Sequence, residues 1–480
     1  MSEMIRLRVL PILLAGVLAG AAVPAHAAIL LGIGEIGGSA DLSGLTGTLE
    51  NGLPANILGG MGSGFAWAGG NTFIATPDRG PNATPWNNKV DETSSYISRF
   101  HTLNMSLQAN PQAGALPFQV NAKLASTTLL WSADKLNYGT AGTPNTAGLN
   151  NTGGRNYFTG RSDAFDASKG SNNSNNARFD PEGVRVSADG KSVFVSDEYG
   201  PYVYQFDRAT GERIKAFELP GSLAVKTLGA TTAAEDKPVN TSGRVANKGM
   251  EGLAITPDGK TLVGIMQAPL LQDNKGQVRI VTVDVATGET KQFAYKLTDG
   301  SGVSEIVAIN DHEFLVDERD GKGLGDGSAA AVKKGYRIDI SGATPIPNDS
   351  TKGDLSKYLV SKTPTATVDV VAMLTKPSNE GGAGLTAAQV PAKIEGYAFG
   401  QDVTFEGKTL HTLWVANDND FVSGVAGQNK FYVFGLNDSE LGGHFVPQAI
   451  TAPVPEPESY ALMGMGLLGL CVVRRRKQRC

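Results

Sequence analysis

The sequence predicts an all-β protein folded as a β-propeller, with six blades expected and seven as the alternative. Glycine accounts for 60 of the 480 residues. This share is well above the usual value of about 7% and has no collagen period, so it indicates many tight turns between short strands. Between the two ends of the chain, no long segment has the 3.6-residue apolar period of a helix. One hairpin pattern instead recurs five times, which is typical of a fold built from similar blades.

Each copy of the hairpin has an alternating strand, a tight turn and a second strand. Residues 182–194 read EGVRVSADGKSVF, and residues 251–263 read EGLAITPDGKTLV. The Asp-Gly pair supplies the positive φ angles that a tight hairpin favours. Looser copies begin at residues 305 and 395, and an earlier copy begins at Ser63, where the others have glutamate. A jelly roll or sandwich would also be all-β, but neither explains a recurring hairpin with acids at matched positions.

The spacing of the copies sets the expected number of blades. A four-stranded blade takes about 40 to 50 residues, whereas 119 residues separate the copy at residue 63 from the copy at residue 182. We therefore expect a further blade in this interval, with strands near residues 97–103 and 117–131. Residues 29–36, which read ILLGIGEI, are expected to join the last blade and close the ring.

Residues 133–178 are predicted to form a polar insertion at the surface. They are rich in Asn, Gly, Thr and Ser, in stretches such as TAGTPNTAGLNNTGG and SKGSNNSNN. A segment with so little apolar content buries too little surface to order itself. We therefore expect that a short linker can replace this insertion without loss of the fold.

Residues 1–27 have the organisation of a secretory signal peptide, with a membrane anchor that stays in place as the alternative. Arg6 and Arg8 precede a short apolar run, and small residues lead to Ala27. This order predicts cleavage by signal peptidase after about Ala27. The remaining body, residues 28–453, contains no cysteine. Disulfide frameworks, thiolate zinc sites and cysteine nucleophiles are thereby excluded from it.

The C-terminal tail, residues 454–480, has three parts in a fixed order. Pro455, Glu456 and Pro457 precede a 14-residue apolar run, and a cluster of arginine and lysine residues follows it. A helix of this length spans about 21 Å, less than the roughly 30 Å hydrocarbon core, so it predicts a transient inner-membrane anchor with its basic end in the cytoplasm. An ordinary C-terminal anchor is the alternative.

This tail closely resembles the PEP-CTERM sorting signal of Gram-negative bacteria. The resemblance implies that an exosortase recognises Pro455, Glu456 and Pro457. It also implies that the tail is removed and that the protein reaches the cell surface or the extracellular matrix.

The charge of the chain argues against a nucleic-acid partner. The formal net charge is −5 at pH 7, and several of the basic residues lie in the tail, so the body is more acidic than this value suggests. Cationic ligands or metal ions fit such a surface better than a polyanion does. The sequence also lacks a Gly-x-Ser-x-Gly elbow, a His-Glu-x-x-His motif and a Walker lysine, which excludes the usual serine-esterase, zinc-protease and nucleotide sites.

Glutamates at the start of the repeated hairpin are candidate metal ligands. In a propeller, equivalent positions of successive blades converge near the central channel. Carboxylates brought together there repel one another unless protons or cations compensate them, and hard oxygen ligands favour Ca²⁺ most, with Mg²⁺ also possible. The alternative is a structural role, in which each carboxylate accepts hydrogen bonds from the backbone of a neighbouring blade. The predicted ligands are Glu182, Glu251, Glu305 and Glu395.

A second group of acids lies near the end of the second strand of each copy, with cations close by. The stretches DERD and NDND follow the apolar strands EFLV and TLWV, so they are not simple hairpin turns. The candidate catalytic residues are Asp78, Arg79, Asp197, Glu198, Lys248, Glu318, Arg319, Lys393 and Asp418.

Five short motifs carry a resemblance to a known family. They are DPEG at 180–183, SDEYG at 196–200, NKGMEGLA at 247–254, DERDG at 317–321 and NDNDF at 417–421. As an ordered set they resemble the phytase-like domain named for the esterase-like activity of phytase, over about residues 60–440. The resemblance implies a propeller body and a phosphatase or esterase activity. The chain departs from the pattern at Ser63 and at Met266-Gln267, where other copies have acids.

Calcium-dependent propeller phytases offer an analogy for the chemistry. In them, metal ions bridge carboxylates and substrate phosphate, and an activated water attacks phosphorus. The resemblance therefore implies an exported, metal-dependent hydrolase of small phosphorylated or ester substrates. The alternative is a non-catalytic surface propeller that binds a polysaccharide or a protein partner through the same acidic face. Whether the protein is an enzyme stays open at this point.

Overall fold

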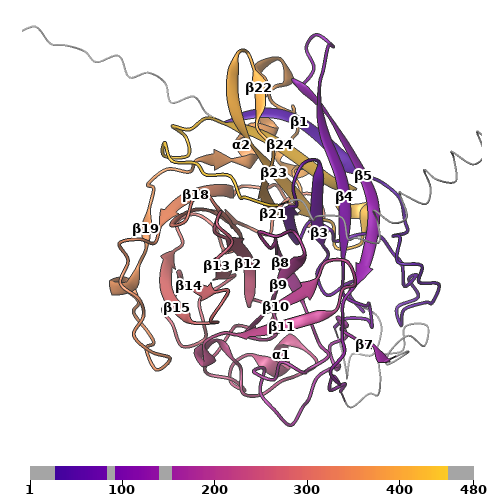
Figure 1. Ribbon diagram of the computed structural model, residues 1–480, viewed down its shortest axis with the longest axis vertical. Coiled ribbons are helices and arrows are strands. Elements are labelled where there is room, and N and C mark those ends of the chain that lie inside the picture. The colour runs from indigo at the N-terminus through magenta and orange to yellow at the C-terminus, as the bar shows by residue number, and fades with distance from the viewer. Residues whose placement is uncertain (1–27, 84–91, 140–153, 452–480) are drawn as a thin grey trace, which may run out of the picture.

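The computed structural model describes residues 28–83, 92–139 and 154–451. These residues form a five-bladed β-propeller, with antiparallel sheets arranged around a central channel (Figure 1). The predicted signal peptide and sorting tail lie outside the described residues. Among the described residues, helices are few and short, and none is long and apolar enough to cross a membrane.

Each blade is an antiparallel sheet, and its successive strands lie progressively farther from the channel. The first blade consists of β2 (Gly64–Trp67), β3 (Thr72–Thr76), β4 (Arg99–Ala109) and β5 (Phe118–Leu129). The second consists of β8 (Pro181–Val186), β9 (Ser192–Asp197), β10 (Tyr202–Asp207) and β11 (Arg213–Glu218). The third consists of β12 (Met250–Ile255), β13 (Thr261–Met266), β14 (Gln277–Asp284) and β15 (Thr290–Lys296).

The last two blades have additional pieces. The fourth consists of β16 (Gly302–Ala308), β17 (Glu313–Arg319) and β18 (Lys333–Asp339), with the short strands β19 (Ser361–Lys362) and β20 (Val368–Asp369) outside. The fifth consists of β21 (Lys393–Phe399), β23 (Lys408–Asp418), β24 (Asn429–Leu436) and β1 (Ile29–Ile36), and β22 (Val403–Phe405) pairs with β23. Beyond the blades lie the helices α1 (Thr232–Glu235), α2 (Val370–Thr375) and α3 (Ser423–Ala426), and the strand pair β6 (Trp131–Ser132) and β7 (Asn156–Tyr157).

The recurring hairpin forms the two innermost strands of every blade. The inner strands contact one another in a closed ring, in the order β2, β8, β12, β16 and β21. Every residue of β8 and of β12 is buried, because both faces of an inner strand are covered by neighbouring blades. Apolar side chains of adjacent sheets pack between the blades, such as Leu253 and Val263 of the third blade with Ile306 and Phe314 of the fourth.

The prediction of six or seven blades is wrong, because five are present. The strands expected near residues 97–103 and 117–131 are β4 and β5, and they complete the first blade instead of starting another. β4 pairs with β3, as at Phe73↔Leu103, and then with β5. Each hairpin copy forms only the inner half of a blade. The distance between two copies therefore gives the number of blades only once the outer strands of each blade have been located.

The prediction that residues 29–36 close the ring is confirmed. Strand β1 pairs antiparallel with β24, from Ile29↔Gly435 to Ile36↔Asn429. The outermost strand of the fifth blade therefore comes from the start of the described chain and the other four strands from its end (Figure 1). This arrangement ties the two ends of the propeller together by backbone hydrogen bonds.

The insertion at 133–178 differs from the predicted surface loop over its described part. Phe158 is fully buried and lies 5.4 Å, centroid to centroid, from both Phe179 and Tyr204. Phe165 is also buried, and it is 7% exposed. The prediction rested on the polar average composition of the segment, and it therefore missed these few apolar side chains, which pack beside the second blade. Residues 140–153 of the insertion lie outside the described residues.

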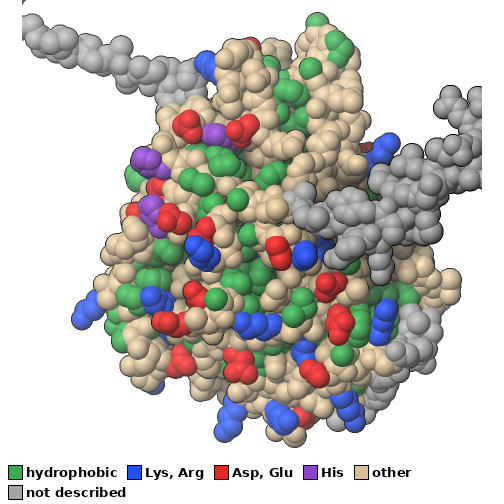
Figure 2. Space-filling view, in the orientation of Figure 1, with side chains coloured by type: hydrophobic (Ala, Val, Ile, Leu, Met, Phe, Trp, Pro, Cys, Tyr) green, Lys and Arg blue, Asp and Glu red, His purple; other side chains and the backbone are tan. Residues whose placement is uncertain are grey.

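A segment that we call the strap, residues 444–451, crosses one end of the channel (Figure 1). Its backbone N–H groups donate from Val446 to Ile309 O at 2.8 Å and from Thr451 to Ala188 O at 2.8 Å. Phe445 packs on Phe399, with ring centroids 4.8 Å apart. The strap thus contacts the second, fourth and fifth blades. Figure 2 shows this face, where acidic and basic side chains are interspersed.

Candidate functional site

A cavity of about 260 Å³ lies at the end of the channel opposite the strap. Its walls come from the first residues of the inner strands and from the residues just after the second strands. These are the two positions at which the repeated hairpin carries acids. The predicted residues that line the cavity are Asp78, Arg79, Glu182, Glu198, Lys248, Glu251, Arg319, Lys393, Glu395 and Asp418.

β-Bulges aim the glutamates into the cavity. The pairing register shifts around Glu182 in β8, around Glu251 in β12 and around Glu395 in β21. A bulge inserts an extra residue into a strand and re-aims its side chain. The three carboxylates therefore face the channel although the strands themselves are packed between blades.

The glycine after each glutamate allows the inner strands to approach closely. A Cβ atom on Gly183 would lie 2.5 Å from Leu253 N of the next blade, and one on Gly252 would lie 2.8 Å from Glu305 Cα. Both contacts are too short for a real side chain, so glycine is required there. The Glu-Gly motif therefore combines a packing residue with a cavity residue, and this is why it recurs.

Glu305 does not reach the cavity, although it was grouped with the other glutamates. The register shift in β16 lies around Ser304, so Ser304 holds the position of the cavity glutamates and Glu305 holds the position of the glycine. Glu305 Oε1 accepts hydrogen bonds from Leu253 N at 3.1 Å and from Ile306 N at 2.9 Å. Its Oε2 lies 3.1 Å from Arg185 Nη2.

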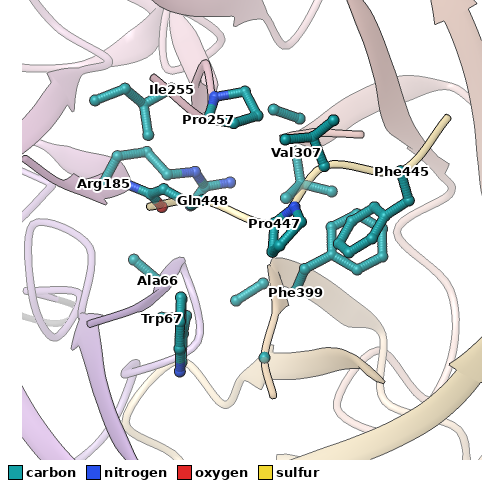
Figure 3. A pocket seen from close by; sticks show the side chains of 14 residues that line it. Ala66, Trp67, Arg185, Ile255, Pro257, Val307, Phe399, Phe445, Pro447 and Gln448 are labelled. Atoms are coloured by element: carbon teal, nitrogen blue, oxygen red, sulfur yellow. The ribbon is translucent and has the colours of Figure 1, made fainter. Parts of the chain in front are cut away.

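The Arg185–Glu305 ion pair blocks the channel midway along the inner strands. Arg185 Nη1 donates to Phe65 O at 2.7 Å, and Nη2 donates to Ile306 O at 2.8 Å and to Tyr397 O at 3.3 Å. Together with the bond from Leu253 N to Glu305, these contacts join all five inner strands. On the strap side Arg185 borders a pocket of only about 30 Å³, together with Pro447 and Gln448 (Figure 3).

Two other predicted residues also lie outside the cavity wall. Asp197 accepts hydrogen bonds from Tyr199 N at 2.9 Å and from Asp180 N at 3.1 Å, so it orders the turn after β9. Glu318 accepts from Tyr295 Oη at 2.6 Å and from three consecutive backbone N–H groups, beginning at Thr298. Side chains alternate along β17, and Glu318 therefore points away from the channel while Arg319 points into it.

Three cations of the cavity are paired with acids. Arg79 Nη1 lies 3.2 Å from Asp180 Oδ2, and Lys393 Nζ lies 2.9 Å from Asp418 Oδ2. Lys393 also pairs with Asp420. Arg319 bridges Glu395 and Glu251 through Nη2. Lys248 has no ion pair with any described residue, and its side chain is exposed at the mouth.

Two groups of carboxylates lie close enough to share a metal ion. In each group the oxygen atoms of three residues lie within 4.8 Å of one another. Asp78, Asp418 and Asp420 form the first group, and Lys393 already neutralises two of its members. The second group is Asp180, Glu182 and Glu198. We name it the acid triad.

Two members of the acid triad, Glu182 and Glu198, carry the uncompensated negative charge of the cavity. Arg79 pairs with Asp180, but neither Glu182 nor Glu198 has an ion pair with a cation among the described residues. Burial, with the charge of Glu251 next, raises the pKa of both Glu182 and Glu198 well above the usual range. These two carboxyl groups therefore need a proton or a cation.

Burial also raises the pKa of other acids that line the cavity. It raises the pKa of Glu395 to about 8, although Arg319 opposes the shift. It raises the pKa of Asp78 well above its ordinary value, with the charge of Asp418 adding to the effect. For Asp418, burial is outweighed by Lys393, which holds its pKa below the usual range. The pKa values of the carboxyl groups around the cavity are therefore shifted in opposite directions.

Several residues at or beside the cavity were not among the predicted site residues, although the family motifs DPEG, NKGMEGLA and NDNDF contain them. Asp180 is fully buried and holds Arg79 through its backbone N–H at 2.8 Å as well as its guanidinium. It stands before the Glu-Gly of a single copy, so the repeat gave no signal for it. Asn247 lines the cavity and has a positive φ of 51°, and Asp420 has a φ of 49°. Such backbone strain in non-glycine residues is visible only in the structure.

The chain was also compared with known proteins. The family model described as phytase-like, esterase-like activity of phytase, matches residues 56–421, and the PEP-CTERM protein-sorting motif matches residues 453–477. An uncharacterized secreted protein of Arthroderma benhamiae is 29% identical over 309 residues, which cover 54% of this chain and 55% of that protein. The chain therefore spans about half the length of this curated relative.

Solved structures resemble the chain only remotely. The periplasmic gluconolactonase of Pseudomonas aeruginosa is 12% identical, with 84% of this chain and 94% of that chain covered and a TM-score of 0.29. The glutaminyl cyclase of Myxococcus xanthus is 8% identical, with 85% and 99% covered and a TM-score of 0.30. At these scores the likenesses support no functional argument.

Two conclusions follow from the matches. The sorting motif, which implies processing by an exosortase, shows an exported, cell-surface protein. The family model covers most of the chain and includes every cavity residue named above. The protein therefore belongs to the phytase-like family described by the esterase-like activity of phytase.

Proposed function

We propose that the protein is a metal-dependent hydrolase of small phosphoric esters and that the cavity is its active site. The observation that carries this proposal is the arrangement of charge. Glu182 and Glu198 of the acid triad pair with no cation among the described residues, and they line the same 260 Å³ cavity as Arg79, Lys248 and Arg319. Carboxylates that need a cation and cations that suit a phosphate are the two halves of a site for metal-assisted phosphoryl transfer.

The acid triad fits a divalent metal ion. All its donors are carboxylate oxygens, which suit Ca²⁺ or Mg²⁺, and Ca²⁺ tolerates such an irregular donor set better. Glu182 is 5% exposed and has no hydrogen bond or ion pair with a described residue, so its carboxylate is available as a ligand. A divalent cation held by Asp180, Glu182 and Glu198 would supply Lewis acidity beside the substrate.

The remaining cavity residues bind the phosphate group of the substrate and donate a proton to its leaving group. Lys248 is unpaired and stands at the mouth, where it attracts the phosphate group. Arg79 is fixed by Asp180 and by Thr93, whose Oγ1 accepts from Nε at 3.1 Å, so it presents its charge in one orientation. Asp78 has a raised pKa because it is buried. In its protonated form it is suited to donate a proton to the leaving-group oxygen.

Hydrolysis assays of residues 28–453 test the proposal. p-Nitrophenyl phosphate, phytate and p-nitrophenyl acetate are offered with Ca²⁺ and with EDTA. We expect Ca²⁺-dependent release of phosphate, and a loss of at least about 100-fold in kcat/KM in Glu182→Gln, because a ligand of the metal loses its charge. Glu289→Gln, an exposed glutamate far from the channel, serves as the matched control.

The same assays distinguish the alternative function. A protein that hydrolyses none of the three substrates in Ca²⁺ is not the proposed enzyme. If such a protein retains a Ca²⁺-dependent ligand affinity at the cavity, the non-catalytic surface propeller becomes the better description.

A further inference from the structure

A groove adjoins the cavity on the side of the third blade. It encloses about 430 Å³ and is lined by Lys237, Val245, Pro269, Leu271 and Lys275, among others. Lys248 and Ala268 belong to the walls of both the groove and the cavity. The two spaces are therefore contiguous, and a molecule whose head lies in the cavity can extend directly into the groove.

The groove has positively charged side chains that are free to pair with a ligand. Lys237 and Lys275 are exposed and have no ion pair with a described residue. The two acids of the groove are already engaged. Asp273 holds Arg279 through both carboxylate oxygens, at 2.7 and 3.0 Å, and Asp236 accepts a hydrogen bond from Ala246 N at 2.8 Å. A negatively charged group in the groove therefore meets two lysines without an ion pair among the described residues. Of the two nearby carboxylates, Asp273 is neutralised by Arg279, and Asp236 accepts one backbone hydrogen bond.

The floor of the groove is apolar. Leu270 is buried, and Val245, Pro269 and Leu271 are partly exposed to the groove. Binding sites for organic ligands usually combine such apolar walls with a few polar groups that fix orientation. The cavity itself is smaller than the roughly 300 to 1,000 Å³ typical of these sites. It accommodates the reacting head of a substrate, and the rest of the substrate requires adjoining space.

We propose that this groove binds the leaving group of the substrate and selects one with an apolar body and a negative charge at its far end. The inference rests on the proposed function, since it assigns the phosphate to the cavity. The apolar floor holds the body of the leaving group, and Lys237 and Lys275 hold its terminal anion. Compact polar substrates use the cavity alone and gain nothing from the groove.

Phosphonates test this proposal without any reaction, because their C–P bond is not hydrolysed. Isothermal titration calorimetry with Ca²⁺ present compares hexylphosphonate with 6-phosphonohexanoate, and undecylphosphonate with 11-phosphonoundecanoate. We expect the terminal carboxylate to tighten binding about fivefold at one or both lengths, which is the gain expected of two partly exposed charge pairs. The gain should shrink as salt is added.

Variants assign the effect to the groove. The double variant Lys237→Ser/Lys275→Ser should remove the preference for the carboxylate and leave the affinity for the alkylphosphonates unchanged. Leu271→Ser should weaken all four ligands and leave methylphosphonate unaffected. Lys260→Ser, an exposed lysine on a hairpin at the strap end, is the matched control and should behave as the wild type does.

The outcomes separate this proposal from the proposed function. Equal affinities for each pair of phosphonates, or a preference that survives the double lysine substitution, overturn the groove as a leaving-group site even if p-nitrophenyl phosphate is hydrolysed. A carboxylate preference lost in the double variant supports the groove even if no ester is hydrolysed, in which case the hydrolase proposal fails alone. Absence of binding by every phosphonate overturns the groove as well.

Discussion

Replacing Glu305 with alanine should destabilise the entire propeller. The side chains of Glu305 and Arg185 are 1% and 4% exposed, so removal of the carboxylate leaves a buried guanidinium without a counter-charge. Loss of one partner of a buried pair costs about 3–5 kcal/mol. The N–H groups of Leu253 and Ile306 also lose an acceptor, and each orphaned donor adds about 1 kcal/mol or more. We expect a total loss of about 5–7 kcal/mol, a large part of the 5–15 kcal/mol that stabilises a typical domain.

Urea unfolding of residues 28–453, followed by tryptophan fluorescence and far-UV circular dichroism, measures this loss. Glu305→Gln separates the two contributions, because its amide oxygen still accepts from both N–H groups while the charge is gone. It should be more stable than Glu305→Ala by about 1–3 kcal/mol. The exposed Glu289→Gln is the control. If Glu305→Ala unfolds within about 1 kcal/mol of the wild type, inside the range of ordinary substitutions, the ion pair does not join the five blades as argued.

Four further outcomes are expected. Burial raises the pKa of Asp317 to about 6, so the folded state holds an extra proton and this group contributes a loss of about 3 kcal/mol of stability as the pH rises from 4 to above 6. Urea titrations at several pH values should therefore show a steeper loss of stability over this range in the wild type than in Asp317→Asn. Phe158→Ala should cost about 3–5 kcal/mol in the same unfolding assay because the ring is fully buried, and a near-neutral result would restore the surface-loop interpretation. Millimolar Ca²⁺ should raise the melting temperature of the wild type and not of Glu182→Gln, and coincident wild-type melts in Ca²⁺ and EDTA would contradict the metal site. Mass spectrometry of the exported protein should find a C-terminus near Pro455, and an intact Cys480 would show that the tail is not removed.

The sequence predicted the inner half of every blade, because its signals are local. Alternation along the strand and the Asp-Gly turn are read within about a dozen residues. The number of blades was predicted wrongly because it depends on how far the outer strands lie from the hairpin. β4 and β5 are separated from β3 by residues 77–98, and no periodicity crosses such a gap.

The site was predicted to the extent that it follows the repeat. Glu182, Glu251 and Glu395 occupy equivalent bulges and line one cavity, as the repeat implied. Glu305 was misplaced because aligning Glu with Glu ignores the bulge, and a shift of one residue turns a side chain to the opposite face. Asp180 was missed because it has no counterpart in the other copies of the hairpin, although the family motif DPEG at 180–183 contains it.

Because β1 pairs with β24, closure of the ring depends on the order in which the strands are synthesised and exported. The partners Ile29 and Gly435 stand at opposite ends of the described chain, so β1 is synthesised and exported first and its partner strand last. Until β24 arrives, β1 presents an open sheet edge, which is prone to pair with other chains. The strap and the sorting motif, which matches residues 453–477, come after β24 in the sequence. The motif therefore emerges when every strand needed to close the ring is already present, and a chain truncated before β24 is left with an open propeller.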